Sequence, residues 1–203
     1  MARAPGQRFS AMNTPTHLIV ALAALARKNN SARRNLAVAA GALAPDLSIF
    51  VFYFWAKIVR AMPEAQIWRD AYWREPWQTL GAVSNSVPLM AVLLVLSYWR
   101  RAPLLGVFAL AGLIHVALDF PVHADDAHRH FWPLTQWRFH SPVSYWDPSH
   151  YGVIGGAIEL LLLIGTAFVL WVRFTSLWVR VALALTVASY FFVGVYFRIA
   201  FAA

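Results

Sequence analysis

Ionisable side chains within apolar stretches of the chain are the first candidates for chemistry. His115 and Asp119 are four residues apart, so a helix places them on one face. Asp46 interrupts a second apolar stretch directly after a proline, and His17 stands near the start of a third. Because an ionisable side chain is costly inside a membrane, each of these residues is a candidate for a functional site.

Metal binding is one chemistry that these residue types can perform together. The chain contains no cysteine, so imidazole and carboxylate are its main metal ligands. Such a set of nitrogen and oxygen ligands suits Zn²⁺, and Mn²⁺ or Fe²⁺ less specifically. With an open coordination position, the metal would activate water and polarise a phosphoryl or acyl oxygen. The four residues together predict a metal site or a polar catalytic site.

Each of the four residues also has an ordinary structural explanation, and these alternatives stay open. His17 could cap a helix or lie at the membrane interface. His115 and Asp119 could be a hydrogen-bonded pair inside a helix bundle. Asp46 could satisfy backbone groups at the kink that Pro45 introduces.

The segment from residue 121 to 150 is rich in histidine, aspartate and tryptophan. Its run from His123 to His130 could supply a second metal, a general base or, with Arg129 and Arg138, a phosphate-binding edge. The alternative is an interfacial loop with tryptophans among lipid headgroups, and we favour it for most of these positions.

Three further residues are predicted to line the site. His123 and Asp126 follow Asp119 closely in the sequence and are candidate bases for an attacking water. Asn85 stands at the predicted start of another apolar stretch and would face the same place. These three residues are therefore the candidate catalytic residues.

The composition identifies the class of protein that positions these residues. Of the 203 residues, 60% are hydrophobic and 13% are charged, whereas soluble domains average about 45–50% and about 25%. Ten tryptophans fit the aromatic belts of membrane proteins. The net charge of +8 is interpreted as topology-setting charge, because no basic run with interleaved aromatics lies outside the apolar stretches. A soluble enzyme and a nucleic-acid partner are therefore set aside.

The apolar stretches predict an all-α polytopic membrane bundle of about six helices that forms one integral membrane domain over residues 1–203. A span needs about 17–25 helical residues, so the short first stretch crosses only with local thinning of the bilayer. Residues 1–12 are expected to be an N-terminal extension, and residues 121–150 an extramembrane loop between the fourth and fifth spans. The spans are predicted at 14–26, 35–56, 81–99, 102–120, 151–172 and 181–197.

Charge predicts the orientation of the bundle. The short turns between spans carry cations and no acid, whereas the long segments 57–80 and 121–150 carry acids as well. Short loops rich in lysine and arginine favour the cytoplasm, so the long segments are expected outside it. If the first helix crosses, the candidate site residues all lie toward the extracytoplasmic side. The cations of the short turns are Arg27, Lys28, Arg33, Arg34, Arg100, Arg101, Arg173 and Arg180.

The order of the motifs resembles a family of bacterial inner-membrane metal-dependent hydrolases typified by YdjM, which is distantly similar to the zinc-dependent phospholipase C/D group. The histidine-rich stretch 128–134 is similar to one branch of that family. The matching motifs are Asn13-Thr14-Pro15-Thr16-His17, Gly41-Ala42-Leu43-Ala44-Pro45-Asp46 and Gly112-Leu113-Ile114-His115-Val116-Ala117-Leu118-Asp119.

The resemblance implies a multi-pass protein of the bacterial inner membrane that hydrolyses an ester or phosphoester, with a lipid or lipid-linked substrate. Its divalent metal, zinc before manganese or iron, would be held by His17, Asp46, His115 and Asp119. Two positions depart from the family pattern. Ser48 stands where the family has a second acid, and Asn85 stands where it has a histidine.

Two rival functions follow from these departures and from the spans. The first is a non-catalytic subunit or assembly factor of a larger membrane complex that retains a degenerate metal site, with other membrane proteins as partners. The second is a small transporter, but nothing in the sequence resembles the paired broken helices of inverted repeats. In the hydrolase interpretation, membrane lipids are the expected partners.

Overall fold

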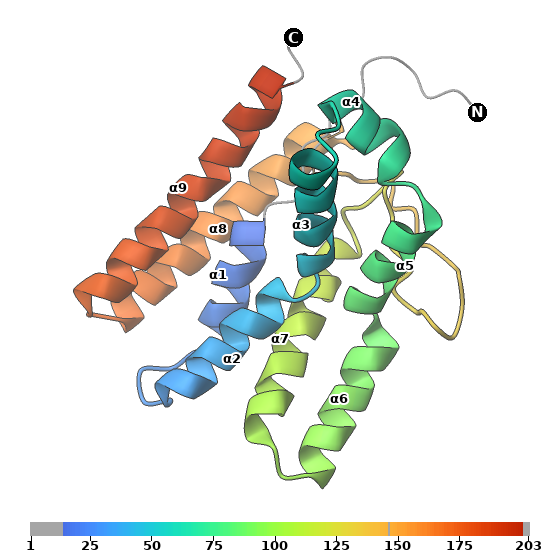
Figure 1. The fold of residues 1–203 in the computed structure, drawn as a ribbon. Helices are drawn as coiled ribbons and strands as arrows, with labels where there is room; N and C mark the ends of the chain where they lie inside the picture. The colour runs from blue at the N-terminus through green and yellow to red at the C-terminus, as the bar shows by residue number, and fades with distance from the viewer. Residues whose placement is uncertain (1–13, 146, 201–203) are drawn as a thin grey trace.

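The computed structural model describes residues 14–145 and 147–200, with side chains from residue 193 onward described only for Val195. The predicted extension 1–12 lies outside these residues. Within them the chain is helical and contains no strand, as the sequence predicted. The helices are α1 Thr14–Leu25, α2 Ala32–Leu43, α3 Leu47–Phe54, α4 Glu64–Gln66, α5 Glu75–Ser84, α6 Val87–Trp99, α7 Pro103–Asp119, α8 Gly152–Arg173 and α9 Leu177–Ala200 (Figure 1).

The predicted six spans are not confirmed. Among the residues that the structure describes in full, two stretches are long and apolar enough to cross a membrane, namely Glu75–Trp99 and Gly152–Arg173. A third span is possible if α2 and the bent continuation of α3 cross together. Two other apolar helices are shorter, because α1 has 12 residues and α7 has 17, whereas a straight span needs about 20. Helix α9 is described in full only over Leu177–Phe192, which is also shorter than a span.

The break between α2 and α3 falls at the proline that the sequence predicted to kink this stretch. The two helices meet at 63°, because Pro45 cannot continue the backbone hydrogen-bond pattern. The side chain of Ser48 donates to the carbonyl oxygen of Pro45, 3.2 Å away. The break therefore turns Asp46 out of a regular helix and holds it at a fixed corner.

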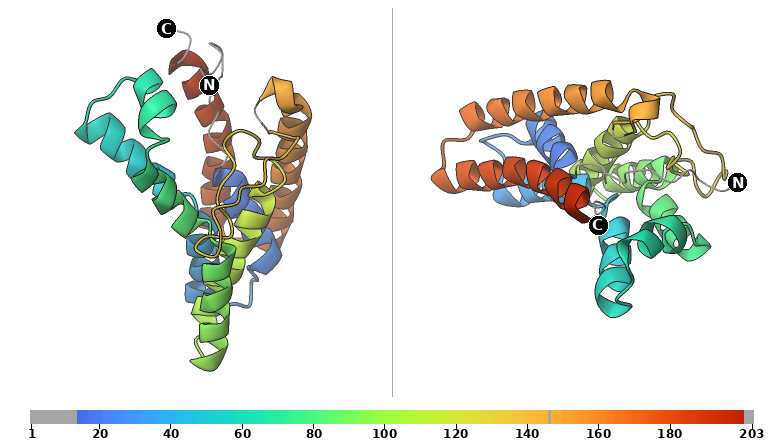
Figure 2. Two further views of the ribbon diagram at one scale, coloured as in Figure 1. Left: turned by 90° about the vertical axis from the view of Figure 1, so that its right-hand side faces the viewer. Right: turned by 90° about the horizontal axis from the view of Figure 1, so that it is seen from above.

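Residues 57–80 are largely helical, although the sequence predicted a loop there. The segment continues α3 through a π-helical turn, Trp55–Val59, and a second such turn, Ile67–Ala71, precedes α5. Trp68 packs its ring against that of Phe52, so aromatic packing orders the segment. Figure 2 shows the result, an arm of α3, α4 and α5 that stands apart from α8 and α9.

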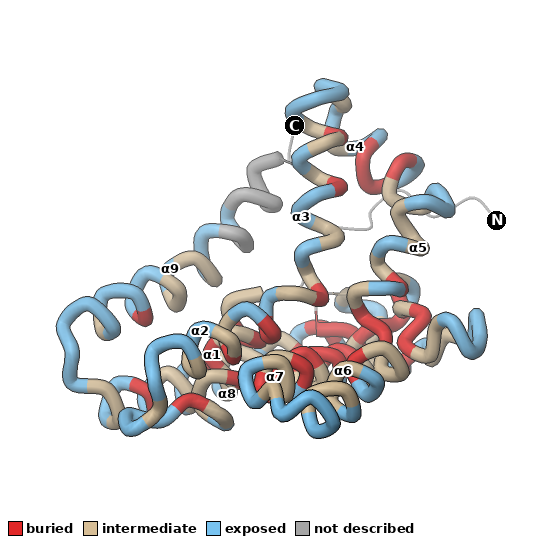
Figure 3. The backbone as a smooth tube through the Cα atoms, turned by 60° about the horizontal axis from the view of Figure 1, so that its bottom comes forward, coloured by how far each residue is buried: buried red, intermediate tan, exposed pale blue. Residues whose placement is uncertain are grey.

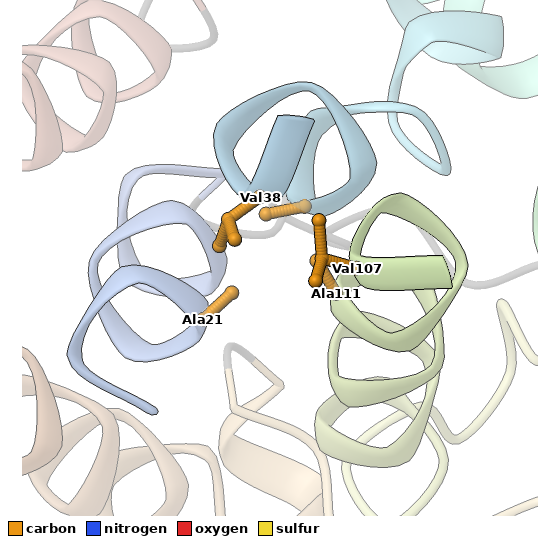
Figure 4. Packing of buried hydrophobic residues seen from close by; sticks show 5 residues of the cluster. Ala21, Val38, Val107 and Ala111 are labelled. Carbon is orange, nitrogen blue, oxygen red and sulfur yellow. The ribbon is translucent and has the colours of Figure 1, made fainter. Parts of the chain in front are cut away.

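The core of the molecule lies where α1, α2 and α7 meet (Figure 4). Small side chains let the helices approach closely, and a Cβ atom added to Gly41 would lie only 2.0 Å from the carbonyl oxygen of Phe108 on α7. In Figure 3, buried residues gather around these helices, while the described part of α9 is mostly exposed or half-buried. The cluster shown in Figure 4 consists of Ala21, Val38, Ala42, Val107 and Ala111.

The connections fall into two groups in space. In Figure 1 the three short arginine-bearing turns lie toward the bottom and lower left, and the long loop 121–150 lies toward the upper right. Helix α1 begins away from the short turns and α7 ends away from them. The start of α1 and the end of α7 thus lie toward the side of the long loop.

Candidate metal centre

The structure brings together the four residues that were singled out as metal ligands. His17, His115 and Asp119 are 1%, 0% and 1% exposed. Each offers a ligand atom, and these atoms all lie within 4.8 Å of one another. Asp46 adjoins them, with its Oδ1 atom 3.5 Å from Nε2 of His115. These buried histidines and carboxylates could hold a metal ion.

His115 and Asp119 are positioned by the last turns of α7. Their four-residue spacing places both on one face, with Nε2 of His115 3.2 Å from Oδ2 of Asp119. Nδ1 of His115 donates to the carbonyl oxygen of Ala42, 2.7 Å away. Because a carbonyl oxygen only accepts, Nδ1 carries the proton, and the Nε2 atom of the neutral ring has a lone pair that a metal can accept.

His17 reaches the same place from the first turn of α1. Its ring stacks on that of His115, with centroids 3.8 Å apart. Its Nε2 atom lies 3.0 Å from Oδ1 of Asp119. The predicted alternative, an interfacial residue at a helix start, does not describe this side chain, because it is almost fully buried.

Asp46 is held at the corner between α2 and α3 by Thr14, which was not among the predicted site residues. The hydroxyl of Thr14 donates to Oδ2 of Asp46 over 2.5 Å. This contact leaves Oδ1 of Asp46 facing His115. The first residue of α1 therefore fixes a carboxylate on the neighbouring helix.

The spacing of the ligand atoms fits a small divalent ion. In a tetrahedral zinc site with bonds of about 2.0–2.1 Å, ligand atoms lie about 3.3 Å apart. The contacts of Asp119 with His17 and His115 measure 3.0 and 3.2 Å, and that of His115 with Asp46 measures 3.5 Å. Imidazole and carboxylate are also ligands that zinc accepts, so these residues fit such an ion in both chemistry and spacing.

A second group of possible ligands adjoins the first and shares Asp119 with it. Asp119, His123 and His128 also offer ligand atoms within 4.8 Å of one another. Nε2 of His123 lies 3.8 Å from Oδ1 of Asp119, and its Nδ1 lies 3.0 Å from Oδ2 of Asp126. The predicted catalytic residues His123 and Asp126 thus form a pair beside the predicted ligands.

Burial and neighbours shift the pKa values of the two loop histidines in opposite directions. Burial, with nearby His123 and His130, lowers the pKa of His128 to about 3, so its ring is neutral. Burial also acts to lower the pKa of His123, but the carboxylates of Asp126 and Asp119 outweigh it and raise that pKa well above the ordinary value. His123 must therefore release a proton before it binds a metal.

Asn85, the third predicted catalytic residue, lies in the break between α5 and α6 and braces the neighbouring corner. Its Nδ2 atom donates to the carbonyl oxygens of Pro45, at 3.3 Å, and Gly81, at 3.0 Å. Its Oδ1 atom is buried and accepts no hydrogen bond from the described residues. These contacts give Asn85 a structural role and bring its side chain to the corner that carries Asp46.

The two arginines of the predicted phosphate-binding edge are already engaged. Arg129 lies 2.8 Å from Glu75 and binds Gln136. Arg138 donates to the carbonyl oxygen of Ala127 and to the side chain of Gln78. Both side chains thus tie the long loop to itself and to α5.

His128 was not among the predicted ligands or catalytic residues. The run His123–His130 was considered as the source of a second metal site, but most of its positions were interpreted as interfacial. The spacing alone could not identify His128, because its approach to Asp119 depends on how the loop folds back over the end of α7. Backbone bonds fix that fold, including one from Val87 N to the carbonyl oxygen of His130, over 2.8 Å.

No family model, curated protein or solved structure matches the chain. The resemblance to YdjM-like hydrolases therefore stays a hypothesis that rests on the three motifs.

Proposed function

We propose that the protein is an integral membrane hydrolase that uses a divalent metal ion, zinc before manganese or iron, to cleave an ester or phosphoester. The observation that carries this proposal is that two helices, α1 and α7, and the break between α2 and α3 bring four possible ligands together, namely His17, Asp46, His115 and Asp119. Two imidazoles and two carboxylates at ligand spacing are expensive to bury without a cation.

The residues around the centre supply complementary roles. A bound divalent ion polarises a phosphoryl or acyl oxygen and makes nearby water more acidic. Asp126, which is paired with His123 over 3.0 Å, would take up the proton that the water loses. His115 is held for metal binding by its bond to Ala42, as orienting partners hold metal-ligating histidines in general.

The substrate class follows from the position of the centre. The ligands lie at the start of α1 and the end of α7, both apolar helices, and at the break in a third apolar segment. A site at the ends of apolar helices would open among lipid headgroups, where ester and phosphoester bonds of lipids lie. We therefore propose a lipid or lipid-linked substrate, in a bacterial inner membrane and on its extracytoplasmic side.

The first test is the metal content of the protein purified without chelators, measured by elemental mass spectrometry. The variant His115→Asn keeps a donor near Ala42 but lacks the ligand atom Nε2. We expect near-stoichiometric metal in the wild type and a clear loss in this variant. Absence of metal from the wild type, even after incubation with zinc, would contradict the proposal.

Hydrolysis is tested separately with a panel of lipid esters and phosphoesters in mixed micelles. Activity should depend on added metal and fall at least 100-fold in His115→Asn, because loss of metal removes both water activation and charge stabilisation. The loop variant His140→Ala serves as the control, since His140 is exposed and its ring binds the carbonyl oxygen of Ala124.

A non-catalytic subunit is the second candidate, and the positions of Ser48 and Asn85 favour it. Both side chains bind the carbonyl oxygen of Pro45 and brace the helix break, where the resembled family has an acid and a histidine. Co-purification of a fixed partner in mild detergent, together with bound metal and no hydrolysis of the panel, would support this candidate. A monodisperse and active particle would exclude it.

A further inference from the structure

The carboxylate of Asp119 faces an imidazole beyond the two that belong to the first ligand group, which consists of His17, His115 and Asp119. His17 and His115 face it from α1 and α7, and His123 faces it from the loop at 3.8 Å. A carboxylate has two oxygens and can bind one cation with each. Asp119 therefore lies between two sets of ligands.

The second set is built as a binding site rather than as an exposed loop. His123 is 4% exposed, and the rings of His123 and His128 approach edge to face with centroids 4.9 Å apart. Asp126 binds the far nitrogen of His123, an arrangement that orients metal-ligating histidines in many proteins. The backbone is tied in place as well, because Ser141 N donates to the carbonyl oxygen of His123 over 2.9 Å.

The carboxylates around Asp119 carry negative charge that cations would balance. Asp46, Asp119 and Asp126 each pair with imidazoles. A neutral imidazole does not compensate a carboxylate, so three carboxylates in this largely buried region require protons or metal ions for balance. Once His123 has released its proton, one divalent ion would leave one negative charge, and a second ion would be held by ligands already in place.

We propose that Asp119, His123 and His128 bind a second divalent metal ion, and that Asp119 bridges it to the first. This inference rests on the proposed metal centre and extends it to a two-metal site. Pairs of ions about 3.5–4 Å apart are a common arrangement in enzymes that cleave phosphoesters, where they stabilise the attacking and the leaving oxygen. The substrate class that fits such a pair is a phosphoester rather than a carboxylic ester.

Metal stoichiometry after saturation with zinc and removal of excess tests the proposal without any activity assay. The wild type should bind two ions, His128→Ala one, His115→Asn one and Asp119→Asn none, because only Asp119 serves both ions. His140→Ala should still bind two ions. A loss of both ions in His140→Ala would show that stoichiometry follows loop integrity and would overturn the proposal.

A second measurement on the wild type needs no variant. When the protein is loaded with Mn²⁺, its paramagnetic resonance spectrum should contain the signal of a magnetically coupled pair. A single uncoupled ion that is lost in His115→Asn and kept in His128→Ala would overturn the second site but leave the proposed hydrolase intact. Absence of bound metal from the wild type would overturn both.

Discussion

The imidazole of His17 stacks on the imidazole of His115 with ring centroids 3.8 Å apart and an angle of 18° between the planes. Two charged imidazoles would repel each other in this arrangement, which therefore favours at least one neutral ring. Both Nε2 atoms face the carboxylate of Asp119, at 3.0 and 3.2 Å. A stacked pair that shares one carboxylate is suited to hold a cation and unsuited to hold two protons.

The first prediction separates the stack from the ligand atom. His17→Phe keeps an aromatic ring on His115 but removes the Nε2 atom that faces Asp119. We expect the affinity for zinc, measured by competition with a chelating dye, to fall at least tenfold, or about 1.4 kcal/mol. An unchanged affinity would mean that His17 only packs against His115.

The second prediction concerns the close approach of α2 and α7. A Cβ atom on Gly41 would lie 2.0 Å from the carbonyl oxygen of Phe108, a backbone atom that cannot move alone. Gly41→Ala should therefore destabilise the protein by about 3 kcal/mol or more, and it should weaken metal binding because Ala42, the next residue, orients His115.

Gly165→Ala is the matched control for this substitution. Gly165 also lies within a helix, but nothing lies within 4 Å of its added Cβ atom. Its replacement should leave stability unchanged or raise it by up to about 1 kcal/mol, because alanine is the better helix former. Thermal unfolding in detergent, followed by tryptophan fluorescence, measures both variants. Equal changes in stability in the two variants would show that the contact with Phe108 does not account for the effect of Gly41→Ala.

The sequence predicted the pairs whose geometry is local. The spacing of His115 and Asp119 requires only that α7 be a helix, and the break at Asp46 requires only the chemistry of Pro45. That these residues meet was predicted from the number and direction of the spans. The structure does bring them together, although the lengths of α1 and α7 do not support six full spans.

The parts that could not be predicted depend on tertiary packing. The helical arm over residues 57–80 forms because Trp68 and its aromatic neighbours pack on α3, which no short-range pattern reveals. Similarly, the contact of Thr14 with Asp46 joins α1 to the helix break, and the approach of His128 to Asp119 depends on the folded loop. Local motifs thus identify part of the site, and the rest depends on contacts between residues that are distant in the sequence.

The third prediction asks whether Asn85 braces the corner or binds metal. Asn85→Ala removes the donor to the carbonyl oxygens of Pro45 and Gly81. We expect a loss of stability of about 1–3 kcal/mol, because buried acceptors lose their partner. Metal stoichiometry should remain that of the wild type. A loss of metal without a loss of stability would make Asn85 a ligand and contradict the structural role.

The fourth prediction concerns an ion pair within the arm of α3, α4 and α5. Nζ of Lys57 lies 2.8 Å from Oε1 of Glu64, and the hydroxyl of Tyr53 and the indole nitrogen of Trp68 also donate to this carboxylate. Burial acts to raise the pKa of Glu64, but these three donors outweigh it and hold the pKa below the ordinary value of 4.5. The folded protein therefore favours the charged form of Glu64.

A carboxyl group with a lowered folded-state pKa stabilises the fold above its unfolded-state pKa, and this stabilisation disappears as the pH falls through the folded-state value. Glu64→Gln should accordingly lower stability by about 1 kcal/mol at pH 7, a value typical of a partly exposed ion pair. The difference between wild type and variant should shrink as the pH falls below 4.5. Thermal unfolding in detergent from pH 7 to pH 3 measures this, and a difference that stays constant over the range would show that the charge of Glu64 does not stabilise the arm.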